Sequence, residues 1–181
     1  MREKILLHCC CAVCAGYSIE KLFSLNYEPV LFWFNPNIYP LEEYERRFRE
    51  LERYAKKLSL ELIVGENNET EWRSFVSGLE EEKEGGARCV KCFEYRLTAA
   101  AITAKQQNIE KFTTTLTISP YKNSKNIFLE ANKAAQEQGR TFLEIDFKKQ
   151  DGFLKTMQIA KQENFYRQKY CGCEFSIPKE I

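Results

Sequence analysis

Residues 4–14 of the chain read KILLHCCCAVC, an apolar run that passes directly into a group of four cysteines. The apolar run is short and rich in branched side chains, which is typical of a strand buried on both faces of a sheet. At residues 15–26 apolar side chains recur three and four positions apart, which predicts a helix. The cysteines are therefore expected in the connection between a first strand and a first helix.

The rest of the chain repeats this alternation of strand and helix patterns. Further strands are predicted at residues 29–34, 60–64, 111–116 and 141–145. Helices are predicted at residues 41–59, 90–108, 124–138 and 152–162, with a shorter inserted helix around 69–79. The alternation predicts an α/β fold in one domain, residues 1–181, with a mainly parallel five-stranded sheet flanked by helices.

The composition narrows the classes of protein to consider. The 181 residues include 27 basic and 26 acidic side chains, so the net charge of +1 excludes a generally basic protein and leaves room only for a local basic patch. No run approaches the ~20 apolar residues that cross a bilayer, and the apolar run at the start of the chain is too short for a signal peptide. A cytoplasmic protein without a membrane partner is therefore expected. In a reducing compartment, eight cysteines indicate metal binding or redox chemistry.

The cysteines fall into three groups, which are Cys9, Cys10, Cys11 and Cys14, then Cys89 and Cys92, then Cys171 and Cys173. The first group takes the place where related α/β folds bind phosphate, but it offers sulfur instead of glycines and serines. The second group opens a helix, where residues three apart share one face. Two thiolates from each of these groups suit a tetrahedral zinc or a [4Fe–4S] cluster equally well. A single cysteine is most often a small buried side chain, and Cys9 and Cys14 can be interpreted as spectators of this kind.

The third group reads CGC, and it permits two interpretations. The two cysteines can close a small, strained disulfide that is readily reduced, because Gly172 relieves the crowding. Alternatively, one or both thiolates bind a second metal.

Other candidate residues follow strands at the same edge of the sheet. Tyr121, Lys122 and Asn123 could hold a polar or anionic substrate, although a simple Ser-Pro turn explains them equally well. Asp146 could be a proton donor, a metal ligand or a substrate anchor, or an ordinary residue at a strand exit. The single histidine, His8, is expected to be a hydrogen-bonded structural residue rather than a ligand.

Two stretches are rich in basic residues. The first alternates with glutamates and predicts a solvated, ion-paired helix face, with Arg46, Arg47, Arg49, Arg53, Lys56 and Lys57. The second lies late in the chain, where basic residues are interleaved with Tyr166 and Tyr170, and it favours a surface that contacts RNA.

Four motifs occur in order along nearly the whole chain. They are HxCCAxC at residues 8–14, RCxxCFxxRL at 88–97, TTLxISPY at 114–121 and YCGC at 170–173. Together they resemble the cobalamin-independent epoxyqueuosine reductases, the QueH family. The resemblance implies a fold similar to that of the adenine-nucleotide-hydrolase-like (HUP) domains, with cysteines in place of the phosphate loop. It also implies the last step of queuosine synthesis, in which epoxyqueuosine in tRNA loses its epoxide oxygen.

The resemblance assigns roles to individual residues. Cys10, Cys11, Cys89 and Cys92 correspond to [4Fe–4S] ligands, and Cys171 and Cys173 to a redox-active pair. An additional iron ion is implied beside the cluster, with Cys14 or Asp146 in its environment. The chain departs from the family where it has Cys9 and Val13, so the choice of ligands among its three consecutive cysteines stays open.

Two electrons and two protons are needed to remove an epoxide oxygen. A [4Fe–4S] cluster passes one electron at a time, so the second iron or the Cys171/Cys173 dithiol would complete the transfer, and iron would act as a Lewis acid. Asp146 or Tyr121 would deliver a proton, and an unidentified donor would supply electrons. The rival interpretations are a zinc-stabilised RNA-binding module and a nucleotide-dependent tRNA sulfur-transfer enzyme, which requires a glycine- and serine-rich first loop.

Overall fold

The sheet of this protein is parallel and five-stranded. The computed structural model describes residues 2–177, so the predicted domain limits at residues 1 and 181 lie outside the described part. The strands are β1 (Glu3–Cys9), β2 (Tyr27–Trp33), β3 (Leu62–Val64), β4 (Lys111–Thr114) and β5 (Thr141–Phe142). Their order is β3-β2-β1-β4-β5, and every neighbouring pair is parallel. The predicted α/β fold class is confirmed.

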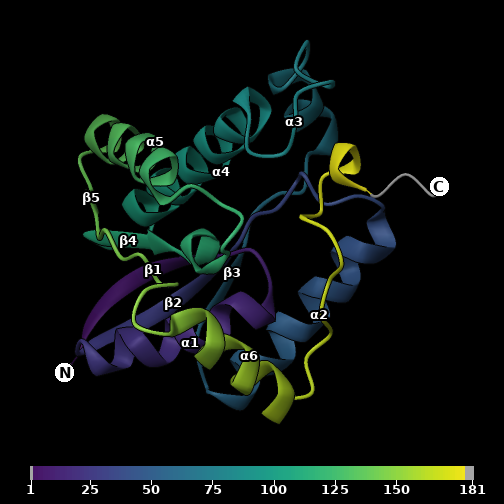
Figure 1. The fold of residues 1–181 in the computed structure, drawn as a ribbon. Helices are drawn as coiled ribbons and strands as arrows, with labels where there is room; N and C mark the ends of the chain where they lie inside the picture. Colours follow the sequence, from purple (N-terminus) through teal and green to yellow (C-terminus); the bar gives the residue numbers. More distant parts are fainter. Residues whose placement is uncertain (1, 178–181) are drawn as a thin grey trace.

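Helices cover both faces of the sheet (Figure 1). They are α1 (Ala12–Ser24), α2 (Leu41–Lys57), α3 (Glu69–Phe75), α4 (Ala87–Gln106), α5 (Ser124–Gln138) and α6 (Gly152–Gln162). Since alternate residues of β1 point to opposite faces, Leu7 packs in a core with α1, α2 and α6, whereas Leu6 packs in a second core with α4 and α5. Within residues 2–177, no helix is long and apolar enough to span a bilayer.

Two helices begin three residues earlier than the sequence pattern predicted. The helix α1 begins at Ala12 because Cys11 caps it, its Sγ accepting a hydrogen bond from the backbone N–H of Cys14 at 3.4 Å. Sulfur here takes the capping role that serine or threonine usually has. The helix α4 begins at Ala87. Cys14 and Cys89 are therefore on first helical turns and Cys92 is on the second turn of α4, with their backbones fixed.

Three strands are shorter than predicted: β3 begins only at Leu62, and β4 and β5 end early. The strand β4 ends at Thr114, and a 3-10 helix follows at Thr115–Ile118. Beyond Phe142, side chains replace the backbone ladder, because Thr113 and Thr117 donate hydroxyl hydrogen bonds to the carbonyls of Leu143 and Ile145. The chain is thereby held at the carboxyl edge of the sheet without forming strand.

The last described segment, residues 165–177, forms a strap that runs beside α2 (Figure 1, yellow). The backbone N–H of Tyr166 donates to Glu50 at 3.2 Å, and the backbone N–H of Tyr39 donates to the carbonyl of Gly172 at 2.8 Å. These bonds bring Cys171 and Cys173 back to the carboxyl edge of the sheet, where the other cysteines lie.

Candidate metal centre and substrate cavity

Three thiols of the first group meet at the start of α1. The Sγ atoms of Cys10, Cys11 and Cys14 all lie within 4.8 Å of one another, and no other such group of three potential metal ligands occurs in residues 2–177. The amide of Gln168, on the strap, donates to Cys11 Sγ at 3.1 Å. Cys14, which spacing alone left as a spectator, is therefore placed among the potential ligands.

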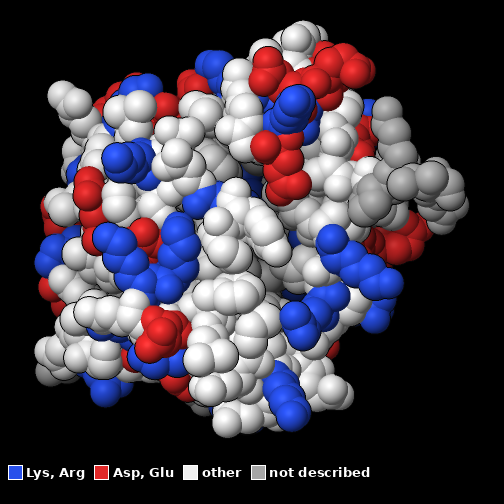
Figure 2. All heavy atoms as spheres, viewed as in Figure 1, with Lys and Arg blue, Asp and Glu red and all other residues white. Residues whose placement is uncertain are grey.

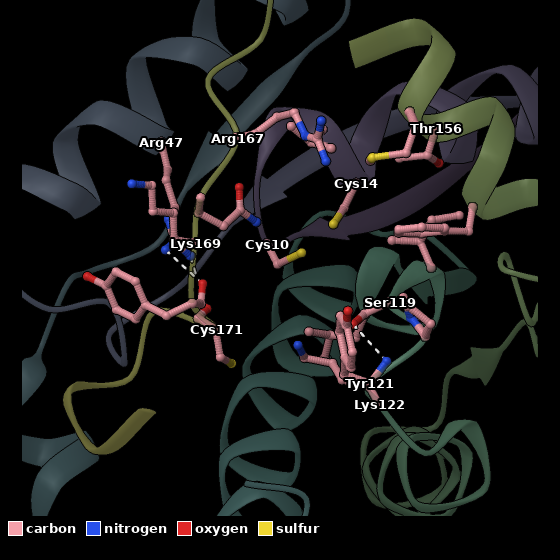
Figure 3. Close-up of a pocket in the computed structure, with 18 of the residues that line it drawn as sticks. Cys10, Cys14, Arg47, Ser119, Tyr121, Lys122, Thr156, Arg167, Lys169 and Cys171 are labelled. Atoms are coloured by element: carbon pink, nitrogen blue, oxygen red, sulfur yellow. Dashed lines mark hydrogen bonds between the residues drawn. The ribbon is translucent and has the colours of Figure 1, made fainter. Parts of the chain in front are cut away.

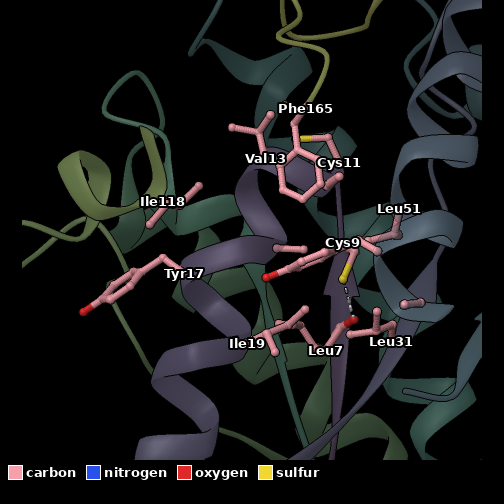
Figure 4. Close-up of a cluster of buried hydrophobic side chains, with 14 of the residues drawn as sticks. Leu7, Cys9, Cys11, Val13, Tyr17, Ile19, Leu31, Leu51, Ile118 and Phe165 are labelled. Atoms are coloured by element: carbon pink, nitrogen blue, oxygen red, sulfur yellow. Dashed lines mark hydrogen bonds between the residues drawn. The ribbon is translucent and has the colours of Figure 1, made fainter. Parts of the chain in front are cut away.

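Cys9 lies apart from them, in the hydrophobic core (Figure 4). It is the last residue of β1, it is fully buried on the same side as Leu7, and its thiol donates to the carbonyl of Leu7 at 3.3 Å. Burial raises the pKa of Cys9 well above its usual range. Its position and burial favour the interpretation of Cys9 as a structural thiol over that of a metal ligand.

The environment of Cys10 has the opposite effect. Hydrogen bonds with the thiols of Cys11 and Cys14 lower the pKa of Cys10 well below its usual value; burial opposes this, and Arg96 and a hydrogen bond from Thr115 add to it. A thiolate, the form that binds metal, is therefore stabilised at Cys10.

The second and third cysteine groups meet at a smaller cavity. It is lined by Cys89, Cys92, Cys171 and Cys173. Cys92 packs with Cys173, Trp72 and Val76, and the backbone N–H of Gly85 donates to Cys89 Sγ at 3.1 Å. All eight cysteines are free thiols. The sequence placed these two groups separately, and the strap brings them together.

A larger cavity of about 650 Å³ adjoins the smaller one (Figure 3). Three thiols line it, those of Cys10, Cys14 and Cys171, and residues of α6, of the turn at 119–122 and of the strap form its walls. Five residues line both cavities, and these are Glu84, Arg96, Tyr121, Lys122 and Cys171. The three cysteine groups therefore border one connected space.

Arg96 is a buried cation in this space and was not predicted as a site residue. Its side chain is 2% exposed, it donates to Asn35, and its Nε has no hydrogen-bond partner. No carboxylate of residues 2–177 forms an ion pair with it. Since an uncompensated buried charge is costly, an anionic group is expected beside Arg96.

Lys122 adds a second positive charge between the cysteine groups. Burial would lower the pKa of Lys122, but electrostatic interactions with Cys171, Cys10 and Cys14 outweigh burial, so that the pKa of Lys122 is raised and the amine stays charged. Soft sulfur ligands surrounded by buried cations fit a thiolate-ligated metal centre with a net negative charge. The residues present therefore fit an iron–sulfur cluster.

Of the other predicted site residues, the structure places two at the cavities and one away from them. Tyr121 lies at the cavity, 82% exposed, and Asn123 lines the smaller cavity. Asp146 is not among the described lining residues of either cavity, and its carboxylate forms an ion pair with Lys148 at 3.2 Å.

His8 has the structural role that was predicted for it. Its ring is fully buried, with Nδ1 2.8 Å from the hydroxyl of Thr114 and Nε2 3.2 Å from the carbonyl of Phe34. Burial lowers the pKa of His8 to about 3, so the ring is neutral.

The prediction of a uniformly solvated face on α2 is wrong at Arg47. Its side chain is 2% exposed and bonds Glu43 at 2.7 Å, the carbonyl of Cys171 at 3.0 Å and the carbonyl of Tyr170 at 3.2 Å. The pair of Glu43 and Arg47 has the same spacing as the exposed pair of Glu45 and Arg49, so nothing local in the sequence distinguishes them. The strap, which comes from a distant part of the chain, buries only the first pair.

Comparison with known proteins gives a consistent result. Residues 5–179 match the family model described as "Epoxyqueuosine reductase QueH". Curated relatives of that name include proteins from Haemophilus influenzae, 35% identical over 97% of this chain and 72% of the relative, and Acinetobacter baylyi, 35% identical over 97% and 81%. A third, from Thermotoga maritima, is 32% identical over 96% of this chain and 90% of the relative.

One solved structure is similar in fold. It is the crystal structure of a predicted subunit of a tRNA methyltransferase from Methanocaldococcus jannaschii, with a TM-score of 0.58 and 14% identity over 84% of this chain and 74% of that chain. At this level of identity the likeness concerns the fold alone.

Proposed function

The chain belongs to the epoxyqueuosine reductase QueH family, and from this premise we propose that it holds a [4Fe–4S] cluster beside the cavity and reduces epoxyqueuosine there, within tRNA. In this reaction both carbon–oxygen bonds of the epoxide break and a carbon–carbon double bond forms. Two electrons and two protons enter, and the oxygen leaves as water. The product is queuosine, and the step is the last of its synthesis.

One observation supports this proposal more than any other. Arg96 is buried in a space that the three cysteine groups border, its Nε has no hydrogen-bond partner, and no carboxylate of the described residues pairs with it. We assign Cys10, Cys11, Cys89 and Cys92 as the cluster ligands, and Cys14, adjoining Cys10 and Cys11, to an additional iron ion. The cluster, when bound, would supply electrons one at a time.

The chain's own residues supply the remaining functions. Cys171 lines both cavities, and together with Cys173 it could form a disulfide, which releases two electrons and two protons. Lys122 carries a proton on Nζ within the same space, where its charge would stabilise the negative charge that develops on the departing oxygen. The ion pair of Asp146 with Lys148 gives Asp146 no comparable support as a proton donor.

The rival functions have less support. The nucleotide-dependent sulfur-transfer enzyme needs a phosphate loop, and cysteines occupy that connection here. A zinc-stabilised module would leave the large cavity and its buried cations without a purpose.

Anaerobic purification followed by metal analysis tests the proposal. We expect a brown protein with about five iron and four sulfide per chain, for the cluster and the additional iron ion, which reduces epoxyqueuosine in tRNA when an artificial electron donor is supplied. The natural electron donor stays unidentified. A colourless protein with zinc and no sulfide would contradict the cluster, and absence of turnover by an iron-loaded protein would contradict the reaction.

A further inference from the structure

Tyr121 is an exposed aromatic ring on a fixed turn. The ring is 82% exposed, yet the turn beneath it is held from several sides. Ser119 accepts hydrogen bonds from the backbone N–H groups of Tyr121 and Lys122, both at 3.3 Å. The amine of Lys148 donates to the carbonyl of Lys122 at 3.2 Å and to the carbonyl of Thr117 at 3.3 Å. A fixed turn thus presents an aromatic face to solvent beside the cavity.

The strap contributes cations to the wall that faces this turn. Arg167 and Lys169 line the large cavity, both are exposed, and neither forms an ion pair with a carboxylate of the described residues. Figure 3 draws Lys169 and Cys171 on one side and Tyr121 on the other, with Cys10 between them. The space-filling view shows basic side chains on either side of an uncharged, hollowed band (Figure 2). Glu84 is the only carboxylate among the described lining residues.

The depth of the thiols restricts the form in which a nucleic acid can enter. Cys10 is part-buried and Cys14 half-buried within the cavity, whose volume of about 650 Å³ is enough for one nucleoside with its substituent. A paired and stacked base cannot reach such a depth, so the reacting nucleotide has to leave the stack. Its neighbours in a single strand are then unstacked, and proteins commonly stack such bases on aromatic side chains.

We propose that Tyr121 is a stacking platform for a base next to the reacting nucleotide, and that Arg167 and Lys169 hold the phosphates of the same single-stranded segment. This inference rests on the proposed function, because it takes tRNA as the substrate. It assigns the Tyr121 ring to RNA recognition, in place of the proton delivery by its hydroxyl that the sequence suggested.

Binding of RNA without reaction tests the inference. The probes are a fluorescently labelled RNA hairpin with a single-stranded loop and a fully paired duplex of the same length, both unmodified. We expect the iron-loaded protein to prefer the hairpin, and Tyr121→Ala to weaken hairpin binding by about tenfold, within the range of one stacked base, with no comparable loss for the duplex. Tyr121→Phe should restore hairpin binding, and the KM for tRNA carrying epoxyqueuosine should follow the hairpin affinity.

Two further variants test the proposed phosphate contacts of Arg167 and Lys169. Arg167→Gln and Lys169→Gln should each reduce the slope of log affinity against log salt by about 0.7, as expected for one lost phosphate contact with a single strand. Arg49→Gln is the matched control, an exposed cation on α2 that pairs with Glu45, and Leu129→Ala is the control for an exposed apolar side chain on α5, 56% exposed.

The contrary results are distinct. Unchanged hairpin binding by Tyr121→Ala would overturn the inference, and so would a loss in Tyr121→Phe as large as in Tyr121→Ala, because the hydroxyl would then be the active group. Intact RNA binding with slower electron delivery from a protein donor would also overturn it, and would assign this surface to that donor. If the wild-type protein failed to reduce epoxyqueuosine while the hairpin effects persisted, only the proposed function would fail.

Discussion

Cys9 and Cys10 are neighbours in the chain, but their side chains lie in different environments, because Cys9 ends β1 and Cys10 is the first residue after the strand. Cys9 follows Leu7 on the same face of the strand and packs in the core, whereas Cys10 lies beside Thr115 and within the influence of Arg96. The alternation of a strand therefore answers a question that cysteine spacing left open. Leu7 and Cys9 are two residues apart, which predicts that both side chains lie on the same face of a strand. This prediction requires that the strand is known to reach residue 9.

Replacing each of these two cysteines by alanine should give different results. Cys9→Ala should keep the full iron content and lower the free energy of unfolding by about 1 kcal/mol, because it removes only a small buried group. Cys10→Ala should lose iron, because it removes a proposed metal ligand. Iron and sulfide analysis with urea denaturation measures both effects. Loss of iron from Cys9→Ala, with retention in Cys10→Ala, would reverse the assignment.

Arg96 should affect the reduction potential of the bound cluster. A buried unit charge several ångströms away contributes roughly 2 kcal/mol at an effective dielectric constant of about 20, which is roughly 80 mV for one electron. The cation favours the more negative, reduced state, so Arg96→Gln should make the potential more negative by that order. A redox titration followed by electron paramagnetic resonance measures the shift.

The matched variant is Arg96→Lys, which keeps the positive charge. Its reduction potential should differ much less from the wild-type value than that of Arg96→Gln. An unchanged potential in Arg96→Gln at full iron content would mean that the cluster lies away from Arg96.

At the scale of elements, the helix α2 and the strap depend on each other. Arg47 donates to two successive carbonyls of the strap, and the ring of Tyr166 packs 3.5 Å from the guanidinium of Arg46, while its hydroxyl donates to Glu43 at 3.0 Å. This network positions Cys171 at the cavity.

Breaking the network at Arg47 should destabilise the protein strongly. Arg47→Gln leaves Glu43 buried without its partner and should lower the free energy of unfolding by about 3 kcal/mol. Arg47→Gln should also make the alkylation of Cys171 faster, because the strap loses two hydrogen bonds. Peptide mapping after alkylation measures this rate. Arg49→Gln is the control on the same helix; its exposed pair with Glu45 should be worth at most about 0.5 kcal/mol. Similar losses in both variants would show that the strap does not depend on Arg47.

Most elements could be predicted because their signals are local. The alternation of apolar runs predicted all five strands and the order of the helices, and Gly139 ends α5 with a left-handed backbone, φ 61°. The early start of α1 was missed because cysteine is an unusual cap, and that of α4 because its N-cap, Gly86, has no side chain to form a capping hydrogen bond. The buried pair of Glu43 and Arg47 and the buried charge of Arg96 could not be predicted, since partners more than 60 residues away determine their environment.

At the scale of the whole molecule, residues 2–177 form two large cores and one small cluster. The large cores lie on the two faces of the sheet and contain many aliphatic and aromatic side chains. The small cluster contains Trp72, Val76, Cys92 and Cys173, and joins α3, the start of α4 and the strap. A cluster of this size has little apolar surface to bury, so a metal centre that links Cys92 to Cys10 and Cys11, as proposed, would supply much of its stability.

Removal of iron should therefore loosen one part of the molecule and leave the rest folded. After anaerobic chelation we expect faster hydrogen exchange in residues 69–93 and 165–177, with unchanged protection in β1, β2 and β4, because the strands belong to the large cores. Hydrogen exchange read by mass spectrometry resolves these segments, and helical circular dichroism should change little. The Cys9→Ala protein, with its iron retained, serves as the control for an effect of sulfur loss alone. A uniform rise in exchange that includes β1 would mean that the metal stabilises the entire fold, and that the sheet does not form a core independent of it.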